Sequence, residues 1–492
     1  MRTTLSGDDT YKLLIAGEWV AGGDGAYPIV NPATEEVIAE APEASADQAR
    51  AAAAAAQAAF PAWSQTSPQE RARLLHAAAD AVKARAKELV PLVIAETGCT
   101  TNVGRTMQVP MVSTRLERYA VGALESGVIP LAPQEVQATA LAPGGLIGAL
   151  ARRVPVGAVA CITSYNFPLV NMVGKLGPAL ATGNTVVVRP AGQDPLAVIE
   201  LVRLLDEVGF PPGVLNIITG SSPVSGQALV ESPDIDMVSF TGSTAVGMQI
   251  GETAGRGLKR QLLELGGKGA AIVFEDADIK SAVGMIGSVW TFHSGQICTA
   301  PTRAIVHRSV YDHVVAGLAK MATVLKVGDP LEQDTVIGPL ITEAHRNRVE
   351  GYIQSGRDEG GEVVTGGGRP AHLEKGWYLE PTLIANCRPD MRAVQEEIFG
   401  PVIVAVPFDD EDEGIAIANG TEFGLYDYVF SKDTSRAMRV SRRMRAGNVG
   451  INTVQRNQET PFGGTKHSGI GRDGGSFGLD AYTELQSVVW PG

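Results

Sequence analysis

The feature that most constrains the fold of this chain is a regular alternation of strand-like and helical segments between residues 156 and 265. Segments of helical period separate short apolar or β-branched runs, which fall at 156–162, 185–188, 214–218, 237–240 and 261–265. Strands that alternate with helices of about 10 to 15 residues predict βαβ units and a parallel sheet. We therefore predict an α/β fold with a Rossmann-like sheet, whose ligands bind beyond the carboxyl ends of its strands.

The rest of the chain predicts further folding units. At 492 residues it is too long for one ordinary core, so two or three domains are expected. Residues 270–452 indicate a second α/β region, while 134–153 and 482–490 resemble exposed strands whose edges favour pairing with another subunit. An alanine-rich helix is predicted over 46–60, and another begins at Ser67 with Pro68 at its first position and a capping box to Glu70.

Composition excludes several classes of partner. The net charge is −13 and no basic stripe offsets it, which argues against nucleic acids and anionic membranes. No window approaches the roughly 20 apolar residues of a membrane span. The four cysteines form no C-x-x-C pair and the seven histidines no H-E-x-x-H motif, so neither a disulfide framework nor a metal site is expected. Residues 1–9 are polar and lack the features of a targeting segment, so a cytoplasmic protein with reduced thiols is expected.

Two short motifs carry residues suited to covalent catalysis. Glu264 opens the segment Glu-Leu-Gly-Gly-Lys, and Cys298 ends the segment Gly-Gln-Ile-Cys. A thiolate can attack a carbonyl carbon, and a carboxylate can activate the water that hydrolyses the resulting thioester. In isolation, however, such a pair is far more often a buried structural cysteine and a surface glutamate, so the rest of the chain must decide.

Other motifs lie where strands are predicted to end. The segment 240–247 follows a strand and opens a helix, so Ser243 and the glycines around it can hold a phosphate; an ordinary glycine-rich turn is the alternative. Asn166 follows the first strand, where its amide can donate to an oxyanion or simply form a turn. A formal G-x-G-x-x-G at 469–474 follows no predicted strand and lies outside the βαβ region, so we reject it as a dinucleotide fingerprint.

Taken together, these motifs resemble the aldehyde dehydrogenase superfamily over nearly the whole chain. The likeness begins at Ile-Ala-Gly-Glu-Trp19 and Asn31-Pro-Ala-Thr. It continues through Tyr165-Asn-Phe-Pro-Leu, the segment 175–184, Phe240-Thr-Gly-Ser and the Glu264 and Cys298 motifs. It ends with Glu396-Glu-Ile-Phe-Gly-Pro and Pro461-Phe-Gly-Gly-Thr-Lys-His-Ser-Gly. So many ordered motifs with matching spacing do not arise by chance.

The resemblance implies a role for each matched residue. Cys298 is the expected nucleophile, Glu264 the general base, and Asn166 with the Cys298 N–H the oxyanion hole, supported by Lys175. Glu397 is expected to hold the nicotinamide ribose, Phe399 to pack near the nicotinamide, and Ser243 to touch the pyrophosphate. The full expected cofactor set is Thr163, Ser164, Arg189, Gly192, Gly242, Ser243, Gly247, Leu265, Glu397 and Phe399. The expected substrate set is Tyr165, Asn171, Gly174, Ile297, Thr299, Arg456 and Phe462.

The reaction implied is oxidation of a small-molecule aldehyde with hydride transfer to NAD or NADP. The thiolate adds to the aldehyde, the thiohemiacetal loses hydride, and Glu264 activates water to hydrolyse the thioester. A CoA-acylating dehydrogenase is the close alternative, although that type usually lacks the glutamate. A non-catalytic member that acts as a binding protein is a further alternative, but it would have no need to retain Cys298, Glu264 and Asn166 together.

The chain departs from the family pattern at the adenosine end of the cofactor. Where the family usually has Lys-Pro-x-Glu, this sequence has Arg189-Pro-Ala-Gly192. Loss of the carboxylate removes repulsion of a 2′-phosphate, and a guanidinium is a suitable phosphate partner. The hypothesis is that NADP is accepted alongside NAD; a conservative Lys-to-Arg exchange without consequence is the alternative.

The substrate side departs as well. Tyr165 follows Ser164 where the family usually has Pro-Trp, and Gly174 stands where a bulky aromatic is common. With Asn171 on the same helix face, this predicts a roomier and more polar tunnel without an aromatic cage for a quaternary ammonium. Arg456 lies in an unusually polar loop and can bind a substrate carboxylate or serve as a rim residue.

The resemblance also implies a three-part architecture. A cofactor domain is expected over 1–132 and 155–265, a catalytic domain over 266–466, and a small β oligomerisation element over 133–154 and 467–492. A homodimer or homotetramer is expected, and the two exposed strand segments agree with it.

Overall fold

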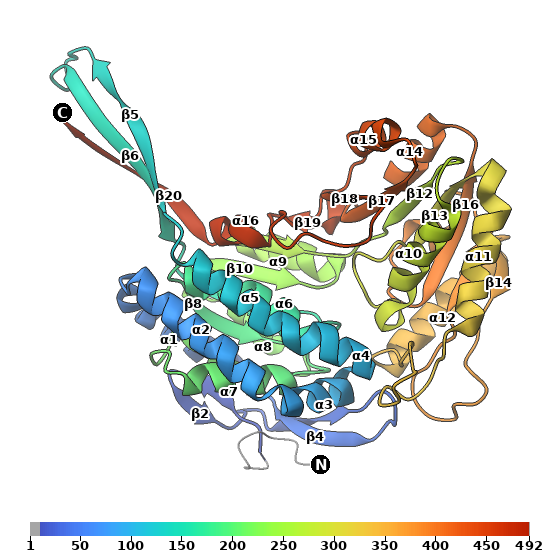
Figure 1. The fold of residues 1–492 in the computed structure, drawn as a ribbon. Coiled ribbons are helices and arrows are strands. Elements are labelled where there is room, and N and C mark those ends of the chain that lie inside the picture. The colour runs from blue at the N-terminus through green and yellow to red at the C-terminus, as the bar shows by residue number, and fades with distance from the viewer. Residues whose placement is uncertain (1–9, 492) are drawn as a thin grey trace.

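The computed structural model describes residues 10–491, and its body is built on two large sheets (Figure 1). The expectation about residues 1–9 lies outside the described residues. The first sheet has eight strands, in the spatial order β19 (Gly469–Ile470), β11 (Arg260–Glu264), β10 (Met237–Thr241), β7 (Ala158–Ile162), β8 (Thr185–Arg189), β9 (Leu215–Ile217), β1 (Leu13–Ile15) and β2 (Glu18–Val20). The pairings from β11 to β9 are parallel, which confirms the predicted α/β sheet.

Helices cover both faces of this sheet. Successive residues of β7 belong to different hydrophobic clusters: Ala158 packs with one and Val159 with the other. The Val159 face is covered by α2 (Pro68–Ala84), α3 (Ala86–Thr97), α5 (Val109–Gly122), α6 (Pro168–Ala181) and α7 (Leu196–Glu207). The opposite face is covered by α1 (Ala46–Ser64), α8 (Val224–Glu231) and α9 (Thr244–Arg256).

The second sheet forms the core of the other half. Its seven strands run in the order β14 (Glu362–Thr365), β15 (Thr382–Ala385), β16 (Val402–Phe408), β13 (Arg303–His307), β12 (Ala270–Val273), β17 (Tyr426–Phe430) and β18 (Asn448–Ile451). One face packs on α10 (Ile279–Thr291) and α11 (Tyr311–Val324). The other packs on α12 (Glu343–Asp358), α13 (Arg392–Gln395), α14 (Glu411–Asn419) and α15 (Thr434–Ser441).

A three-stranded antiparallel sheet projects from the body as an arm (Figure 1). It consists of β20 (Thr483–Pro491), β6 (Gly145–Pro155) and β5 (Val128–Val136). The exposed strands predicted near residues 134–153 and 482–490 are therefore present. The expected domain boundary after residue 132 falls inside β5, because one continuous strand pairs with β6 on both sides of that point. Smaller elements are β3 (Ala26–Val30), β4 (Val37–Pro42), α4 (Thr101–Val103) and α16 (Gly475–Ala481).

Two details differ from the sequence-based expectations. Ser67 caps α2 by accepting a hydrogen bond from the Glu70 N–H, but the Glu70 carboxylate binds Arg73, so the predicted capping box is only half formed. A complete capping box instead starts α1, between Ser45 and Gln48. The G-x-G-x-x-G at 469–474 begins inside β19, not outside the sheet; β19 pairs antiparallel with β11, so the motif still lacks the context of a dinucleotide fingerprint.

Within residues 10–491, no helix is long and apolar enough to span a bilayer. Over the same described range, no group of three histidine, cysteine or acidic side chains is placed to hold a metal ion.

Candidate active site

Cys298 is presented by a tightly constrained loop. After α10, the backbone takes a left-handed turn in which His293, Ser294 and Gly295 have φ values of +48°, +57° and +70°. The buried Gln296 side chain then fixes the loop, because it accepts a hydrogen bond from the Ile341 N–H at 3.1 Å and donates to the His293 carbonyl at 3.3 Å. The loop therefore holds the half-buried thiol in a defined position.

Asn166 lies beside this loop with its amide oriented by hydrogen bonds. Its Oδ1 accepts from Ser164 Oγ at 2.9 Å and from Asn171 Nδ2 at 3.2 Å. Its Nδ2 donates to the Gln296 carbonyl at 2.9 Å. Because the acceptor end is already bound, the donor end faces the loop that carries Cys298, as an oxyanion hole requires.

Glu264 ends β11 with a carboxylate whose hydrogen-bonding capacity is unused. Both carboxylate oxygens are buried and have no hydrogen-bond partner among the described residues. Burial raises the pKa of Glu264 well above its usual range; the charge of Asp473 adds to the rise, and the charges of Lys175 and Arg472 oppose it. A carboxylate with vacant acceptors and a raised pKa suits a general base near neutral pH.

The segment that follows Glu264 packs against the backbone of Cys298. A Cβ on Gly267 would overlap the Cys298 carbonyl, so only glycine permits this approach of the two backbones. The Gly267 N–H donates to Glu397 Oε1 at 2.8 Å. Burial raises the pKa of the Cys298 thiol to about 12, with the charges of Glu397 and Glu264 adding to the rise and that of Arg456 opposing it.

Lys175 is buried under this site, one helix turn beyond Asn171. Its Nζ donates to Ser239 Oγ at 3.2 Å, and Ser239 Oγ shares a 2.7 Å hydrogen bond with the Tyr482 hydroxyl. No hydrogen bond joins Lys175 to Asn166 in the described structure. The expected support of the oxyanion hole by Lys175 therefore does not come from a direct hydrogen bond to Asn166. Burial lowers the pKa of Lys175, while nearby acidic groups, including Asp473 and Glu264, raise it.

Of the cofactor residues expected from the sequence, those from Thr163 to Leu265 follow the carboxyl ends of β7, β8, β10 and β11, on the two sides of the point where the strand order reverses at β7; Glu397 and Phe399 come from the other half. Ser243 caps α9, so the N–H groups of that helix point beyond the sheet edge. Thr163 Oγ1, after β7, and Arg189 Nε, at the end of β8, are buried without a hydrogen-bond partner among the described residues. Close approach of α9 to the sheet depends on Gly247, where a Cβ would overlap Leu265, while Gly242 lies against the Phe240 ring. These vacant donors at a switch point fit a dinucleotide phosphate and ribose.

Arg189 and Gly192 are packed against the loop that follows β9. The Arg189 guanidinium donates to the Ser222 carbonyl at 2.8 Å and to the Gly220 carbonyl at 3.4 Å. A Cβ on Gly192 would lie 2.7 Å from the Gly220 oxygen. Some of the Arg189 N–H groups predicted to bind a 2′-phosphate are therefore already hydrogen-bonded to backbone carbonyls.

Aromatic side chains close the nicotinamide end predicted at Glu397 and Phe399. Phe399 has a φ of +60°, and its carbonyl is bound by His345 Nε2 at 2.7 Å. The Tyr165 ring stands edge-on to Phe399 at a centroid distance of 5.9 Å and to His345 at 6.1 Å. Burial lowers the pKa of His345 to about 4, so its neutral ring donates to the Phe399 carbonyl. Glu397 has its pKa raised to about 7 by burial.

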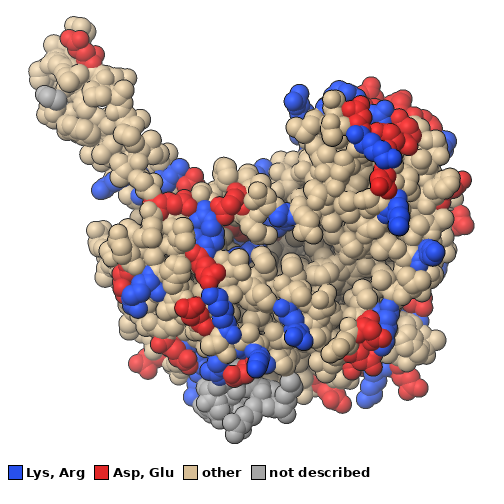
Figure 2. All heavy atoms as spheres, in the orientation of Figure 1, with Lys and Arg blue, Asp and Glu red and all other residues tan. Residues whose placement is uncertain are grey.

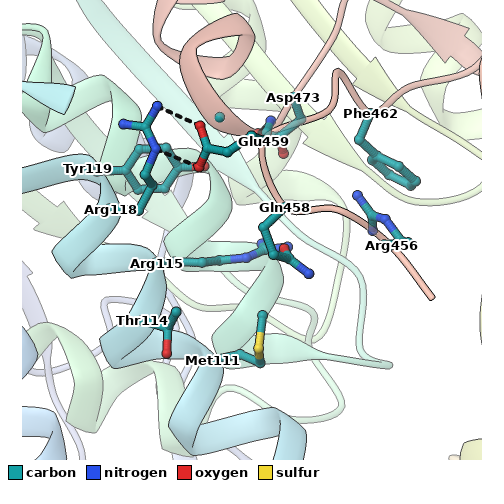
Figure 3. A pocket seen from close by; sticks show the side chains of 12 residues that line it. Met111, Thr114, Arg115, Arg118, Tyr119, Arg456, Gln458, Glu459, Phe462 and Asp473 are labelled. Atoms are coloured by element: carbon teal, nitrogen blue, oxygen red, sulfur yellow. Dashed lines mark hydrogen bonds and ion pairs between the residues drawn. The ribbon is translucent and has the colours of Figure 1, made fainter. Parts of the chain in front are cut away.

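A cavity of about 240 Å³ lies between α5 and the loop that carries Arg456. Figure 3 shows the side chains that line it. The predicted substrate residues Arg456 and Phe462 both line it, with the guanidinium 3.8 Å from the ring centroid. The open space expected at Gly174 is filled, because a Cβ there would lie 2.7 Å from Arg115 Nη1. This corrects the prediction of a roomier tunnel: glycine at 174 makes room for an arginine of another helix.

The remaining predicted substrate residues have different surroundings. Asn171 bonds to Asn166, so in this structure it orients the oxyanion donor. Ile297 and Thr299 flank Cys298 and are half-buried, and the Thr299 carbonyl accepts from the Tyr428 hydroxyl at 2.8 Å.

Sequence reasoning missed Arg115, Gln296 and His345. The positive-φ run before Cys298 was signalled only by Gly295, and an arginine on an amphipathic helix carries no local sign that it faces a cavity.

The chain is similar to known proteins over nearly its whole length. The aldehyde dehydrogenase family matches residues 19–488. The chain is 37% identical to betaine aldehyde dehydrogenase of Bacillus subtilis, over 97% of this chain and 96% of the relative. It is also 37% identical to phenylacetaldehyde dehydrogenase of Pseudomonas fluorescens, over 97% and 95%. A point mutant of Staphylococcus aureus betaine aldehyde dehydrogenase, solved with NAD+, superimposes with a TM-score of 0.94 at 34% identity, over 99% of this chain and 97% of that one.

A largely parallel sheet whose strand order reverses at β7, beside a second α/β sheet, is the architecture of a nicotinamide-dependent oxidoreductase of this family. The chain belongs to the aldehyde dehydrogenase family, and it is an enzyme that oxidises aldehydes with NAD(P).

Proposed function

We propose that this enzyme converts an aldehyde to its carboxylic acid through a thioester on Cys298, which is hydrolysed by water activated by Glu264. The observation that carries this proposal is the Glu264 carboxylate, buried with both oxygens unpartnered on a segment that abuts the Cys298 carbonyl. A buried carboxylate without partners is costly unless the site uses it.

Each residue has one task. The Cys298 thiolate adds to the aldehyde carbon, and Asn166 Nδ2 with the Cys298 N–H stabilises the oxyanion. NAD(P), held beyond the carboxyl ends of the first sheet's strands, would supply the acceptor for the hydride that the thiohemiacetal loses. Glu264 then removes a proton from water as that water attacks the thioester carbon, and Cys298 leaves as the thiolate. Glu397, held by the Gly267 N–H, would bind the nicotinamide ribose.

Glu264 also favours water over CoA as the acyl acceptor. Thiolysis needs no general base for water, so a buried carboxylate beside the thioester would add cost without benefit. The test follows NADH formation from butanal with and without CoA, with product analysis by mass spectrometry. Butanoic acid formed at the same rate with and without CoA supports hydrolysis; butanoyl-CoA as the main product, or no NADH in either case, contradicts it.

For the cofactor, we propose that both NAD and NADP are accepted, because Gly192 leaves no carboxylate to repel a 2′-phosphate. The partly engaged Arg189 guanidinium supplies one vacant N–H to that region. The comparison of kcat/KM for NAD+ and NADP+ tests this. A preference for NAD+ above about a thousandfold would contradict it.

For the assembly, we propose a homodimer or homotetramer held by the projecting arm. For the domains, we propose the division expected from the sequence with one change: all of β5, and not only its residues from 133 onward, belongs to the arm.

A further inference from the structure

The cavity between α5 and the 456–462 loop is lined by three arginines with different partners. Arg118 is neutralised: it binds the Glu459 carboxylate through two hydrogen bonds of 2.7 and 2.8 Å, as the dashed lines in Figure 3 show. Arg115 donates to the Val170 carbonyl at 2.8 Å, and Arg456 faces the Phe462 ring. Neither Arg115 nor Arg456 forms an ion pair within residues 10–491. These two guanidinium groups are the unneutralised cations of the cavity.

The two groups lie near each other and near the reacting thiol. Arg115 and Arg456 line the same cavity. Burial lowers the pKa of Arg456 and the charge of Arg115 lowers it further, while the charge of Arg456 opposes the rise in the pKa of Cys298. Arg115 is anchored on α6 at Val170, one turn after the oxyanion donor Asn166. Gly463, which follows the cavity residue Phe462, lies against the general base, because a Cβ there would stand 2.8 Å from Glu264 Oε1. The cationic cavity between α5 and the 456–462 loop therefore lies beside the reactive site, although Cys298 itself does not line it.

The cationic end is partly balanced by one carboxylate. Asp473 Oδ1 accepts from the Gly474 N–H at 2.7 Å, and Oδ2 lies 3.4 Å from the point where a Cβ on Gly174 would stand, a point that Arg115 approaches to 2.7 Å. Asp473 is thus the one carboxylate of the cavity lining that is not paired with Arg118, so it balances only part of the charge of Arg115 and Arg456.

Building on the proposed function, we infer that the substrate is an aldehyde with a carboxylate at its far end, bound by Arg115 and Arg456 together. Guanidinium groups bind carboxylates through paired charge-assisted hydrogen bonds, and a low-dielectric cavity strengthens them. A cavity of about 240 Å³ suits a short acyl chain. The same charge opposes a cationic aldehyde, so betaine aldehyde is disfavoured in spite of the relatives that bear that name.

Matched substrate pairs test this on the full-length enzyme with NAD+. The pairs are 4-oxobutanoate with butanal and 5-oxopentanoate with pentanal, and betaine aldehyde is the cationic probe. We expect kcat/KM for the carboxylate of at least one pair to exceed that of its neutral partner by roughly 10- to 100-fold, the range of hydrogen bonds to charged groups. Betaine aldehyde should be the poorest substrate.

Variants assign the effect to the two arginines. Arg115→Met and Arg456→Met should each raise KM for the oxoacid and lower the ratio of oxoacid to neutral kcat/KM by about tenfold. Arg456→Lys should have a ratio between those of Arg456→Met and the wild type, because lysine keeps the positive charge but cannot form the paired hydrogen bonds of a guanidinium group. The control is Arg50→Met on the exposed face of α1, which removes an arginine that does not line the cavity and should leave the ratio close to that of the wild type.

The possible results distinguish a failure of the proposed carboxylate site from a failure of the proposed reaction. Wild-type enzyme that oxidises neutral aldehydes as well as the oxoacids would overturn the carboxylate site and leave the proposed chemistry standing. Equal loss of both substrates in the Met variants, with the ratio unchanged, would also overturn it. An enzyme that oxidises none of the five aldehydes would contradict the proposed function itself.

Discussion

At the residue scale, the reactive groups are held in environments that oppose their charged forms. Burial raises the pKa of Cys298 to about 12, and the negative charges of Glu397 and Glu264 push it in the same direction. Arg456 acts in the opposite sense. The positive charge of Arg456 therefore increases the fraction of Cys298 that is present as thiolate. Arg456 thus acts on the nucleophile as well as on the proposed substrate.

Charge changes around the thiol should shift its reactivity in opposite directions. Arg456→Met removes a positive charge, so the pKa of Cys298 should rise and alkylation by iodoacetamide should require higher pH. Glu264→Gln removes a negative charge, so the pKa should fall and alkylation should occur at lower pH. The measurement is the pH dependence of the alkylation rate of Cys298, read by peptide mass spectrometry. Shifts in the same direction for both variants would contradict this electrostatic account.

The adenosine end offers a second prediction. Gly192→Glu introduces a carboxylate where a 2′-phosphate would lie, so kcat/KM for NADP+ should fall by roughly 10- to 100-fold relative to that for NAD+. A Cβ at 192 would lie 2.7 Å from the Gly220 oxygen, so the loop must shift slightly even for alanine. Gly192→Ala is the control for that shift. If both variants change the two cofactors equally, position 192 does not select between them.

At the element scale, the turn before Cys298 carries the greatest backbone constraint in the site. Gly295 has a φ of +70°, and a Cβ there would lie 2.8 Å from the Pro401 nitrogen. Alanine costs about 1–2 kcal/mol in the left-handed region before any clash is counted. The loop and its Gln296 hydrogen bonds therefore depend on glycine at this position.

Gly295→Ala should displace Cys298 and lower both Tm and kcat. The matched control is Gly284→Ala on the exposed face of α10, where a Cβ meets nothing within 4 Å. That change should stabilise the helix by about 0.5–1 kcal/mol and leave kcat unchanged. Differential scanning calorimetry with steady-state kinetics checks both. Full activity in Gly295→Ala would show that the turn does not position the thiol.

The elements of the first sheet could be predicted from the sequence because their periodicity is local. The runs at 156–162 and 237–240 became β7 and β10, within two residues of the predicted bounds. The partners of Asn166 could not be predicted, since Gln296 is 130 residues away and the bond goes to its backbone carbonyl. Arg115 and Gly174 are complementary only after α5 packs on α6, which no single-sequence pattern reveals. The capping box at Ser67 failed for a local reason: Arg73 competes for the Glu70 carboxylate.

At the scale of the whole molecule, the arm is a sheet whose surfaces are not covered by the rest of the chain. All nine residues of β5 are exposed, and most of β20 is exposed as well. Figure 2 shows few charged side chains on the arm compared with the mixed charges of the body. Large exposed side chains on it include Leu131, Leu485 and Val489. Exposed apolar strands of this length favour burial against another subunit.

Charged residues on the arm should therefore weaken the assembly. Leu131→Lys and Val489→Lys place charges on apolar positions that are 49% and 67% exposed in the single chain. Light scattering after size exclusion should show a dimer or tetramer for the wild type and smaller species for these variants. Leu258→Lys, at a position 92% exposed away from the arm, is the control and should not change the mass. A monomeric wild type would contradict the proposed assembly.

The proposed mechanism requires that Cys298 forms the thioester and that Glu264 activates the water that hydrolyses it. A pre-steady-state measurement on Glu264→Gln tests these separate roles directly. With butanal and saturating NAD+, this variant should release a burst of about one NADH per active site and then turn over roughly 100- to 10,000-fold more slowly than the wild type. The intact mass should rise by one butanoyl group, located on Cys298. A variant that turns over as fast as the wild type, or that shows neither burst nor adduct, would contradict the account.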